Sequence, residues 1–203
     1  MIGQQQKDQA EKWFKDLRDK ICKEFEILEE DHLKLAPKSD VAAKKFERKS
    51  TIRETDDKED GGGGVMATLK DGRIFEKVGV NVSAVYGKLA PEAQKSITAR
   101  KAIPELKDDP RFWASGISLV AHMRNPHTPA IHLNTRMFWT PHAWWFGGGT
   151  DLNPSIENDD DTNFFHQTLK KKCDKHNQSY YKKFKEWADE YFFIPHRKVA
   201  RGV

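Results

Sequence analysis

The sequence has few cysteines, no long apolar run and almost no excess of charge. Its two cysteines, Cys22 and Cys173, are far apart, and neither belongs to a CxxC pair. A zinc site built from thiolates and a disulfide framework are therefore both unexpected. We expect two free, unreactive thiols in a reducing compartment.

Membrane and nucleic-acid functions are also disfavoured. No stretch approaches the roughly 18 consecutive apolar residues of a membrane-spanning helix, and the polar N-terminus lacks the apolar segment of a signal peptide. The formal net charge is only +4, and the 35 Lys and Arg residues are mixed with the 31 Asp and Glu residues instead of forming a patch. These features predict a cytoplasmic protein that neither inserts into a membrane nor binds nucleic acid.

Familiar catalytic motifs are missing as well. The eight histidines include no HExxH zinc motif, and the glycine runs match neither a P-loop nor the GxGxxG dinucleotide fingerprint. There is no Ser-His-Asp order and no paired thiol. The chemistry must therefore be sought in individual polar residues and in their placement on strands and helices.

Helices are predicted near both ends of the chain. Apolar residues recur at three- and four-residue steps over about 8–30, the pattern of a helix that packs one face on a core. Acidic residues precede a second helix at about 163–175, with Thr162 as its expected N-cap. A third helix, at about 180–192, ends before Pro195. Its aromatic stripe, which we expect to be buried, consists of Tyr180, Phe184, Trp187 and Tyr191.

Between these helices, the pattern predicts β-strands joined by hairpins. After a charged, irregular segment at 34–60, strands are expected at 65–69, 74–85, 115–123 and 130–139, with a hairpin turn at Asp71-Gly72 and a short helix at 92–100. Strands and helices do not alternate as they would in a parallel sheet. We therefore predict the α+β class, with an antiparallel sheet covered by helices.

Two glycine runs each allow two interpretations. The run 61–64 is either a flexible linker or a place where a ligand approaches the backbone closely. The run 147–149 follows the apolar residues 144–146. It is either a tight turn or a device that places the carboxylate of Asp151 at the edge of a pocket.

The strand expected at 130–139 separates two kinds of side chain, because alternate residues of a strand share a face. One face fits a core and consists of Ile131, Leu133, Thr135, Met137 and Trp139. The other carries His132, Asn134 and Arg136, and it is either the wet side of an antiparallel sheet or the floor of a pocket for an anionic ligand. In a pocket, His132 would carry protons near neutral pH and Arg136 would donate twice to a carboxylate.

The histidines also raise the question of a metal ion. His122 and His132 would share an ion if their strands were paired, and His166 and His196 are further candidates. Their spacing matches no known ligand motif. From the residues alone, packing and chance placement are therefore favoured over a metal site.

Several long motifs occur together in the order found in one enzyme family. They occupy residues 61–64, 75–81, 118–136, 144–154, 165–168 and 187–197. Through them, nearly the whole chain beyond about Ala10 resembles the oxygen-dependent coproporphyrinogen III oxidases. The resemblance implies a large antiparallel β-sheet flanked by helices on both sides, in a homodimer.

The resemblance also implies an activity. The family converts two propionate side chains of coproporphyrinogen III to vinyl groups by oxidative decarboxylation, using molecular oxygen and no organic cofactor, and yields protoporphyrinogen IX in haem biosynthesis. The substrate carries four carboxylates, which suit a guanidinium such as that of Arg136. Its pyrrole N–H groups suit an acceptor such as the carboxylate of Asp151.

Carried over by position, the resemblance gives each matching residue a role. His132 matches the proposed proton donor, so that His132, Asp151 and Arg136 are the expected catalytic residues. Substrate contacts are expected from Ser118, Asn134, Thr135 and Arg136. The histidines that match ligands of a possible divalent metal ion in bacterial members are His122, His132, His166 and His196.

The sequence departs from the family pattern in three places. The segment 46–60 lacks the tryptophan that usually precedes the glycine run, and the connection between Phe138 and Trp144 is short, as in a trimmed hairpin. The sequence ends at Val203, before a strand, the interface helices and a Gly-x-Arg segment of the family. We therefore expect a single catalytic domain over 1–203 that is C-terminally incomplete and, with an unpaired sheet edge, poorly soluble or inactive by itself.

Two other hypotheses remain at this point. The chain could be a non-catalytic tetrapyrrole-binding fragment, which would bind porphyrin without consuming oxygen. It could also be a metal-dependent enzyme of another kind built on the four histidines, which would contain stoichiometric metal.

Overall fold

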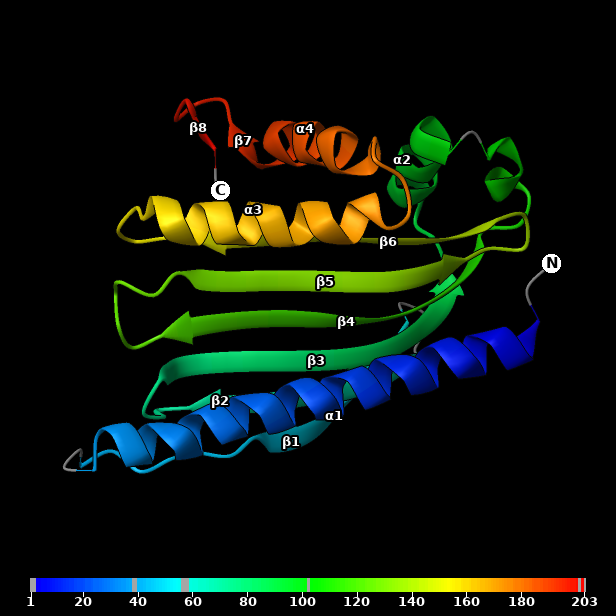
Figure 1. The fold of residues 1–203 in the computed structure, drawn as a ribbon. Helices are drawn as coiled ribbons and strands as arrows, with labels where there is room; N and C mark the ends of the chain where they lie inside the picture. The colour runs from blue at the N-terminus through cyan, green and yellow to red at the C-terminus, as the bar shows by residue number, and fades with distance from the viewer. Residues whose placement is uncertain (1–2, 38–39, 56–58, 102, 201, 203) are drawn as a thin grey trace.

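Six antiparallel strands form the central sheet, in the order in which they follow one another along the chain (Figure 1). They are β1 (Glu47–Glu54), β2 (Asp60–Lys70), β3 (Phe75–Lys88), β4 (Arg111–Met123), β5 (Ala130–Trp139) and β6 (Trp144–Asn153). The computed structural model describes residues 3–37, 40–55, 59–101, 103–200 and 202. All neighbouring strands pair antiparallel, which confirms the predicted α+β class.

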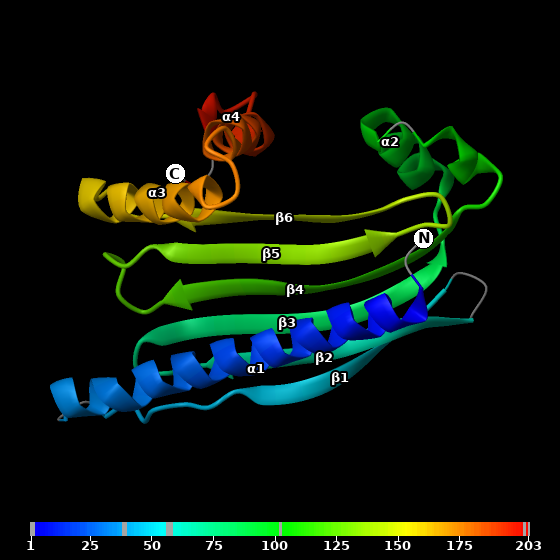
Figure 2. The same ribbon diagram turned by 45° about the vertical axis from the view of Figure 1, so that its right-hand side comes forward.

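One long helix, α1 (Gln4–Leu35), crosses one face of the sheet and packs on β3 and β4 (Figures 1 and 2). The helix predicted at 8–30 is thus confirmed and extends further at both ends. Its Phe14 and Cys22 join a core made of alternate strand residues, among them Leu69, Phe75, Val78, Val80, Val82, Ile117, Leu119 and Met137. Both cysteines are free, as expected, and burial raises the pKa of the Cys22 thiol to about 11.

A buried carboxylate fastens α1 to the sheet. Glu29 is fully buried, and its two oxygens accept backbone N–H groups of Lys44 (3.3 Å), Arg73 (2.6 Å), Ile74 (2.8 Å) and Phe75 (3.1 Å). The predicted Asp71-Gly72 turn is confirmed between β2 and β3. A Cβ at Gly72 would lie 2.5 Å from a Glu29 oxygen, so glycine is needed there. Helix and hairpin therefore hold each other in place.

The other helices lie at one end of the sheet and beside its β6 edge (Figure 1). The first group is α2 (Pro91–Lys101) with the short 3-10 helix η1 (Pro104–Lys107), and the second is the helical hairpin α3 (Asp159–Asp174) and α4 (Tyr180–Phe192), followed by the ribbon β7 (Phe193–Ile194) and β8 (Val199–Ala200). The helices predicted at 92–100, 163–175 and 180–192 are thus confirmed. In the part of the chain that the structure describes, we find no helix with the length and apolarity that a membrane crossing requires.

The start of α3 differs from the prediction. Its N-cap is Asn158, not Thr162: the Asn158 side chain accepts the backbone N–H groups of Asp160 (2.9 Å) and Asp161 (3.3 Å). Three aspartates therefore lie inside the first turn, where they complement the positive end of the helix dipole. An asparagine at 158 satisfies the same free N–H groups that Thr162 was expected to satisfy.

The aromatic stripe of α4 is exposed, so the prediction that it is buried was wrong. The exposed fractions are 40% for Tyr180, 45% for Phe184, 60% for Trp187 and 70% for Tyr191. Among the described residues, α4 packs mainly on α3. Helical periodicity identifies an apolar face, but it does not show which element covers that face.

In the first half of the chain, one prediction was also wrong, and one of the two interpretations of the first glycine run is excluded. The segment expected to be irregular contains β1, an edge strand exposed on both faces, which therefore shows no apolar alternation. The glycines at 61–64 belong to β2 and are not a flexible linker. A Cβ at Gly63 would lie 2.2 Å from the Thr51 carbonyl oxygen, and one at Gly64 would lie 2.3 Å from that of Val82. Close strand packing thus accounts for these two glycines.

The second glycine run is not a tight turn either. The turn lies earlier, where the Thr140 N–H donates to the Ala143 carbonyl at 2.8 Å, and this confirms the trimmed hairpin between Phe138 and Trp144. Residues 147–149 lie inside β6, which continues to Asn153. Asp151 is therefore a strand residue whose position is fixed by pairing with β5.

Candidate functional site

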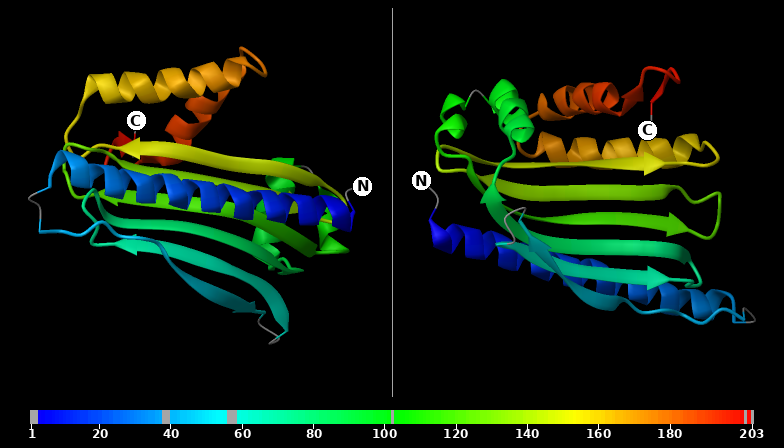
Figure 3. Two further views of the ribbon diagram at one scale, coloured as in Figure 1. Left: turned by 60° about the horizontal axis from the view of Figure 1, so that its bottom comes forward. Right: turned by 180° about the vertical axis from the view of Figure 1, so that it is seen from behind.

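The face of β3–β6 turned away from α1, called here the open face, gathers the polar residues predicted on one side of β5. Pairing places His132 opposite Val120 and Asp151, Asn134 opposite Ser118 and Gly149, and Arg136 opposite Gly116 and Gly147. Directly opposed residues of antiparallel strands point to the same face. Seen from behind, none of the described helices crosses β3, β4 or β5 on this side (Figure 3).

The other side of β5 packs as expected. Ile131, Met137 and Trp139 contact the core under α1. The predicted alternation of β5 is therefore confirmed for both faces. Exposed side chains from neighbouring strands extend the open face, among them Asn81, Ser83 and Ser118.

Four side chains on the open face form a hydrogen-bonded row, called here the polar row: Asp151, His132, Asn134 and Arg136. His132 Nδ1 lies 2.6 Å from Asp151 Oδ1, and His132 Nε2 lies 3.3 Å from Asn134 Nδ2. Arg136 Nη2 lies 3.4 Å from Asn134 Oδ1. Asp151 is 7% exposed, whereas Arg136 is an exposed residue. The row therefore runs from a buried carboxylate to a cation that faces solvent.

The hydrogen bonds of the polar row can all point the same way, from Arg136 toward Asp151. An ionised Asp151 can only accept, so His132 donates to it from Nδ1. In a neutral ring, Nε2 is then an acceptor, which suits the amide NH2 of Asn134. The amide oxygen of Asn134 is left to accept from Arg136. Each group donates to the next toward Asp151, and the lone pair of His132 Nε2 lies on the open face.

Two residues that the sequence had not singled out support this row. Asn153 donates from Nδ2 to Asp151 Oδ2, and Thr150 donates from Oγ1 to the backbone carbonyl of His132 at 2.8 Å. Asn153 follows Asp151 by two residues and therefore shares its face. Recognising residues 144–153 as a strand would have identified it.

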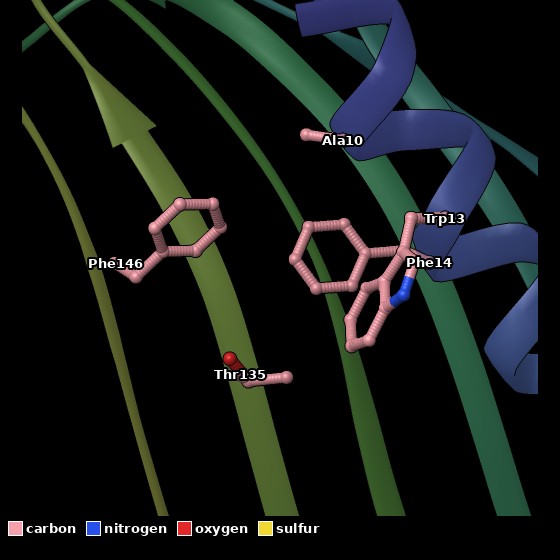
Figure 4. A pocket seen from close by; sticks show the side chains of 5 residues that line it. All are labelled: Ala10, Trp13, Phe14, Thr135 and Phe146. Atoms are coloured by element: carbon pink, nitrogen blue, oxygen red, sulfur yellow. The ribbon is translucent and has the colours of Figure 1, made fainter. Parts of the chain in front are cut away.

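The predicted substrate contacts divide between the two faces. Ser118 is exposed on the open face opposite Asn134, but Thr135 points the other way. With Ala10, Trp13, Phe14 and Phe146, it lines an apolar cavity of about 340 Å³ between α1 and the β5–β6 pair (Figure 4). The structure thus gathers Ser118 with the polar row and separates Thr135 from it.

The four histidines predicted as metal ligands lie on different elements. His122 lies on β4 opposite Lys77, and His196 is exposed between β7 and β8. His166 lies on α3 with its Nδ1 3.1 Å from the Tyr181 hydroxyl, and burial, followed by the charge of Lys185, lowers the pKa of His166. Over the described ranges, no three His, Cys, Asp or Glu residues are arranged to hold a metal ion.

The polar row combines three chemical abilities. Arg136 offers a charged pair of donors to a carboxylate. His132 offers a ring nitrogen that can take up and release a proton. Asp151 and Asn134 fix the orientation of that ring from its two sides. Together they suit an acidic ligand whose reaction needs a proton at a defined place.

Comparisons with known proteins give the chain a family context. Residues 9–203 match the protein family described as Coproporphyrinogen III oxidase. Two proteins named oxygen-dependent coproporphyrinogen-III oxidase, from Rickettsia peacockii (strain Rustic) and Rickettsia conorii (strain ATCC VR-613 / Malish 7), are each 47% identical over 197 residues. Those alignments cover 97% of this chain and 65% of each relative.

A third relative gives the same picture. A protein of the same name from Rickettsia bellii (strain RML369-C) is 43% identical over 202 residues, which cover 100% of this chain and 67% of the relative. The chain spans 65% of the length of the Rickettsia peacockii relative.

Proposed function

Because the chain belongs to the coproporphyrinogen III oxidase family, we propose that its open face binds coproporphyrinogen III and that its polar row takes part in converting two propionate groups to vinyl groups. The observation that carries this proposal is the polar row, with the His132–Asp151 contact of 2.6 Å at one end and Arg136 at the other. The relatives are named oxygen-dependent, which supports molecular oxygen as the co-substrate.

The reaction has a simple balance for each vinyl group. A propionate, R–CH2–CH2–COO−, loses a hydrogen with its bonding electrons from the CH2 group next to the pyrrole. The bond between the other CH2 group and the carboxylate carbon then breaks. The products are R–CH=CH2 and CO2. The hydrogen and its two electrons reduce O2, which takes up one further proton and becomes H2O2. The site must therefore bind a carboxylate and deliver one proton per vinyl group.

Arg136 is the proposed carboxylate-binding residue. Its guanidinium is exposed on the open face and, among the residues that the structure describes, makes one long contact, 3.4 Å, to Asn134 Oδ1, so most of its donors remain available. A guanidinium matches the two oxygens of a carboxylate with two parallel hydrogen bonds. If Arg136 binds a propionate of the tetrapyrrole, either that propionate or the neighbouring one on the tetrapyrrole lies next to His132.

His132 is the proposed proton carrier, and Asp151 is the residue that orients it. His132 Nε2 exchanges the proton on the open face, while Nδ1 remains bonded to the Asp151 carboxylate. Correct orientation and tautomer of such a ring are needed for efficient general acid–base catalysis. Each Asp151 oxygen also keeps a lone pair beyond its bonds to His132 and Asn153, and these can accept pyrrole N–H groups.

The remaining predicted contacts contribute differently. We propose that Asn134 and the exposed Ser118, which face each other across β4 and β5, contact the ligand with their polar side chains. Thr135 lies on the opposite face, so its proposed role is to support β5 from the side of the apolar cavity.

A divalent metal ion bound jointly by His122, His132, His166 and His196 does not fit the geometry of the described residues. His166 lies on α3, with its Nδ1 3.1 Å from the Tyr181 hydroxyl, and over the described ranges no three His, Cys, Asp or Glu residues are arranged to hold a metal ion. The proposed steps therefore use only the side chains of the polar row and the substrate itself.

Three further expectations belong to the same proposal. The family resemblance supports a homodimer, a cytoplasmic location and the absence of an organic cofactor. It also supports a single catalytic unit formed by the sheet and its helices. Sedimentation analysis of the purified chain would distinguish the monomer from the dimer.

The test of the function is a product analysis. The protein is incubated with coproporphyrinogen III in air and, as a control, under argon, and the porphyrinogens are then oxidised to porphyrins and separated by chromatography. Oxygen-dependent formation of the divinyl product, with two equivalents of H2O2, is the expected result. Binding of the tetrapyrrole without any vinyl product would support a binding fragment instead, and failure to bind would contradict the proposal.

A further inference from the structure

Three glycines on the open face have no structural reason to be glycine. Within the described part of the chain, a Cβ at Gly149 would meet no atom within 4 Å, and at Gly147 and Gly79 the nearest atoms would be 3.9 Å and 3.7 Å away. None of the three has a positive φ. All three lie inside strands, where glycine is disfavoured because it loses the most conformational freedom and packs no side chain. Some requirement other than folding of the described chain must account for them.

Other strand glycines of the same sheet behave differently and serve as a reference. Gly148, between the two open-face glycines of β6, faces the other way, and its Cβ would lie 2.3 Å from the Asn134 carbonyl oxygen. Gly63 and Gly64 would collide with neighbouring backbone in the same manner. The run 147–149 therefore contains one glycine that the fold needs and two that it does not.

Gly147 and Gly149 lie directly beside the polar row. Gly149 is opposite Asn134, Gly147 is opposite Arg136, and Asp151 comes next on the same face. Alternate residues along a strand are about 7 Å apart, and neighbouring strands are about 4.8 Å apart. Next to three polar side chains of β5, β6 thus presents bare backbone over two successive positions and then a buried carboxylate.

A stripe of small residues does not by itself indicate a ligand, but the polar row beside it does. Asp151, at one end of the stripe, is more than nine-tenths buried, and its two oxygens are held by His132 Nδ1 and Asn153 Nδ2. Glycine in a strand interior commonly marks a place where a ligand approaches the backbone closely. Gly147 and Gly149 together with the polar row therefore form a surface that is free of side chains on one side and carries polar groups on the other.

We propose that Gly147 and Gly149 determine the size of the ligand: their missing side chains admit the body of a four-pyrrole ring beside Asp151, while the polar row binds its polar groups. This inference rests on the proposed function and adds two specificity-determining residues to it. A ligand with a single pyrrole ring that still carries carboxylates needs less of this surface. Side chains added at 147 or 149 should therefore exclude the large ring and spare the small one.

The experiment uses the full chain and a graded series, Gly149→Ala, Gly149→Val and Gly147→Val. Affinities are measured by fluorescence titration for coproporphyrin III and by calorimetry for porphobilinogen, a monopyrrole with two carboxylates. We expect affinity for coproporphyrin III to fall about 5-fold with alanine and 50-fold or more with valine, the range that overpacking of a close contact produces. Affinity for porphobilinogen should change less than about 3-fold, since surface substitutions usually have small effects.

Thermal unfolding provides the matched control. Gly149→Val and Gly147→Val should leave the midpoint unchanged or raise it, because valine suits a strand better than glycine. Gly148→Ala should lower the midpoint, because its Cβ collides with the backbone of β5. A valine variant that unfolds at lower temperature, as Gly148→Ala does, would mean that the fold needs the glycine and would overturn the proposal.

The binding results separate this inference from the function on which it rests. If the unaltered protein binds coproporphyrin III and the valine variants bind it equally well, the size-selection role is wrong and the proposed function stands. Equal losses for both ligands would also refute size selection. If the unaltered protein binds no tetrapyrrole, the proposed function fails and this inference fails with it.

Discussion

Replacing Asp151 by asparagine keeps the shape of the side chain and reverses one hydrogen bond of the polar row. Asp151 is 7% exposed and accepts from His132 Nδ1 at 2.6 Å and from Asn153 Nδ2. An asparagine at this position has one accepting oxygen, and its NH2 group must face one of those two donors. If the NH2 group faces Asn153, the Asn153 amide can turn its oxygen to accept; if it faces His132, a donor meets the N–H donor on Nδ1.

The reversal propagates along the row. If the new NH2 group faces His132, the neutral ring must carry its hydrogen on Nε2, and Asn134 must turn its amide oxygen toward that hydrogen. The Asn134 NH2 group then faces the guanidinium of Arg136. One unsatisfied donor remains wherever the reversal stops, at a cost of about 1–3 kcal/mol in the free energy of unfolding. With His132 in the wrong tautomer, we expect kcat to fall by about 10²–10⁴-fold.

Nitrogen-15 NMR of the histidine rings measures the tautomer without requiring turnover. We expect the hydrogen of neutral His132 on Nδ1 in the unaltered protein and on Nε2 in Asp151→Asn. Asn153→Ala is the matched control, because it removes the other partner of Asp151 and should leave the hydrogen on Nδ1. An Nε2 hydrogen in the unaltered protein, or the same tautomer in both proteins, would refute the reasoning.

Three further predictions concern binding and stability. Arg136→Lys should weaken coproporphyrin III binding about 10-fold, since lysine lacks the planar fork that matches a carboxylate, and an unchanged Kd in a fluorescence titration would remove Arg136 from the site. Glu29→Gln should lower the free energy of unfolding in urea by about 2–5 kcal/mol, because its new NH2 group faces two backbone N–H donors, either those of Lys44 and Arg73 or those of Ile74 and Phe75; a loss below about 1 kcal/mol would contradict the role given to Glu29. His166 has a lowered pKa in the folded chain, so the stability it contributes is complete above its ordinary value of 6.5 and is lost as the pH falls through the folded-state pKa. The thermal midpoint should drop over that window less in His166→Gln than in the unaltered protein, and identical pH profiles would contradict the assignment.

Strands whose two faces differ were predictable from the sequence. β5 buries one face under α1 and exposes polar groups on the other, so its alternation identified both the strand and the shared face of His132, Asn134 and Arg136. α1 was equally clear, because one side of a long helix packs on the sheet. In both cases the environment of each residue follows from the local period.

Strands without such a contrast were missed. β1 is wet on both faces, and three residues of β6 have no side chain, so neither could show an alternation. The missed strand hid the central pair of the site, because the register that places Asp151 opposite His132 is set by the turn at 140–143 and by the pairing of β6. The aromatic stripe of α4 shows the converse limit: its period was correct, but burial depends on other elements.

The most direct test of the account is a crystal structure of the chain with coproporphyrin III. We predict that the ring lies on the open face over Gly147 and Gly149, with pyrrole nitrogens toward Asp151 and a carboxylate paired with Arg136. A ring bound instead in the apolar cavity lined by Trp13, Phe14 and Phe146, on the opposite face, would contradict the assignment of the site.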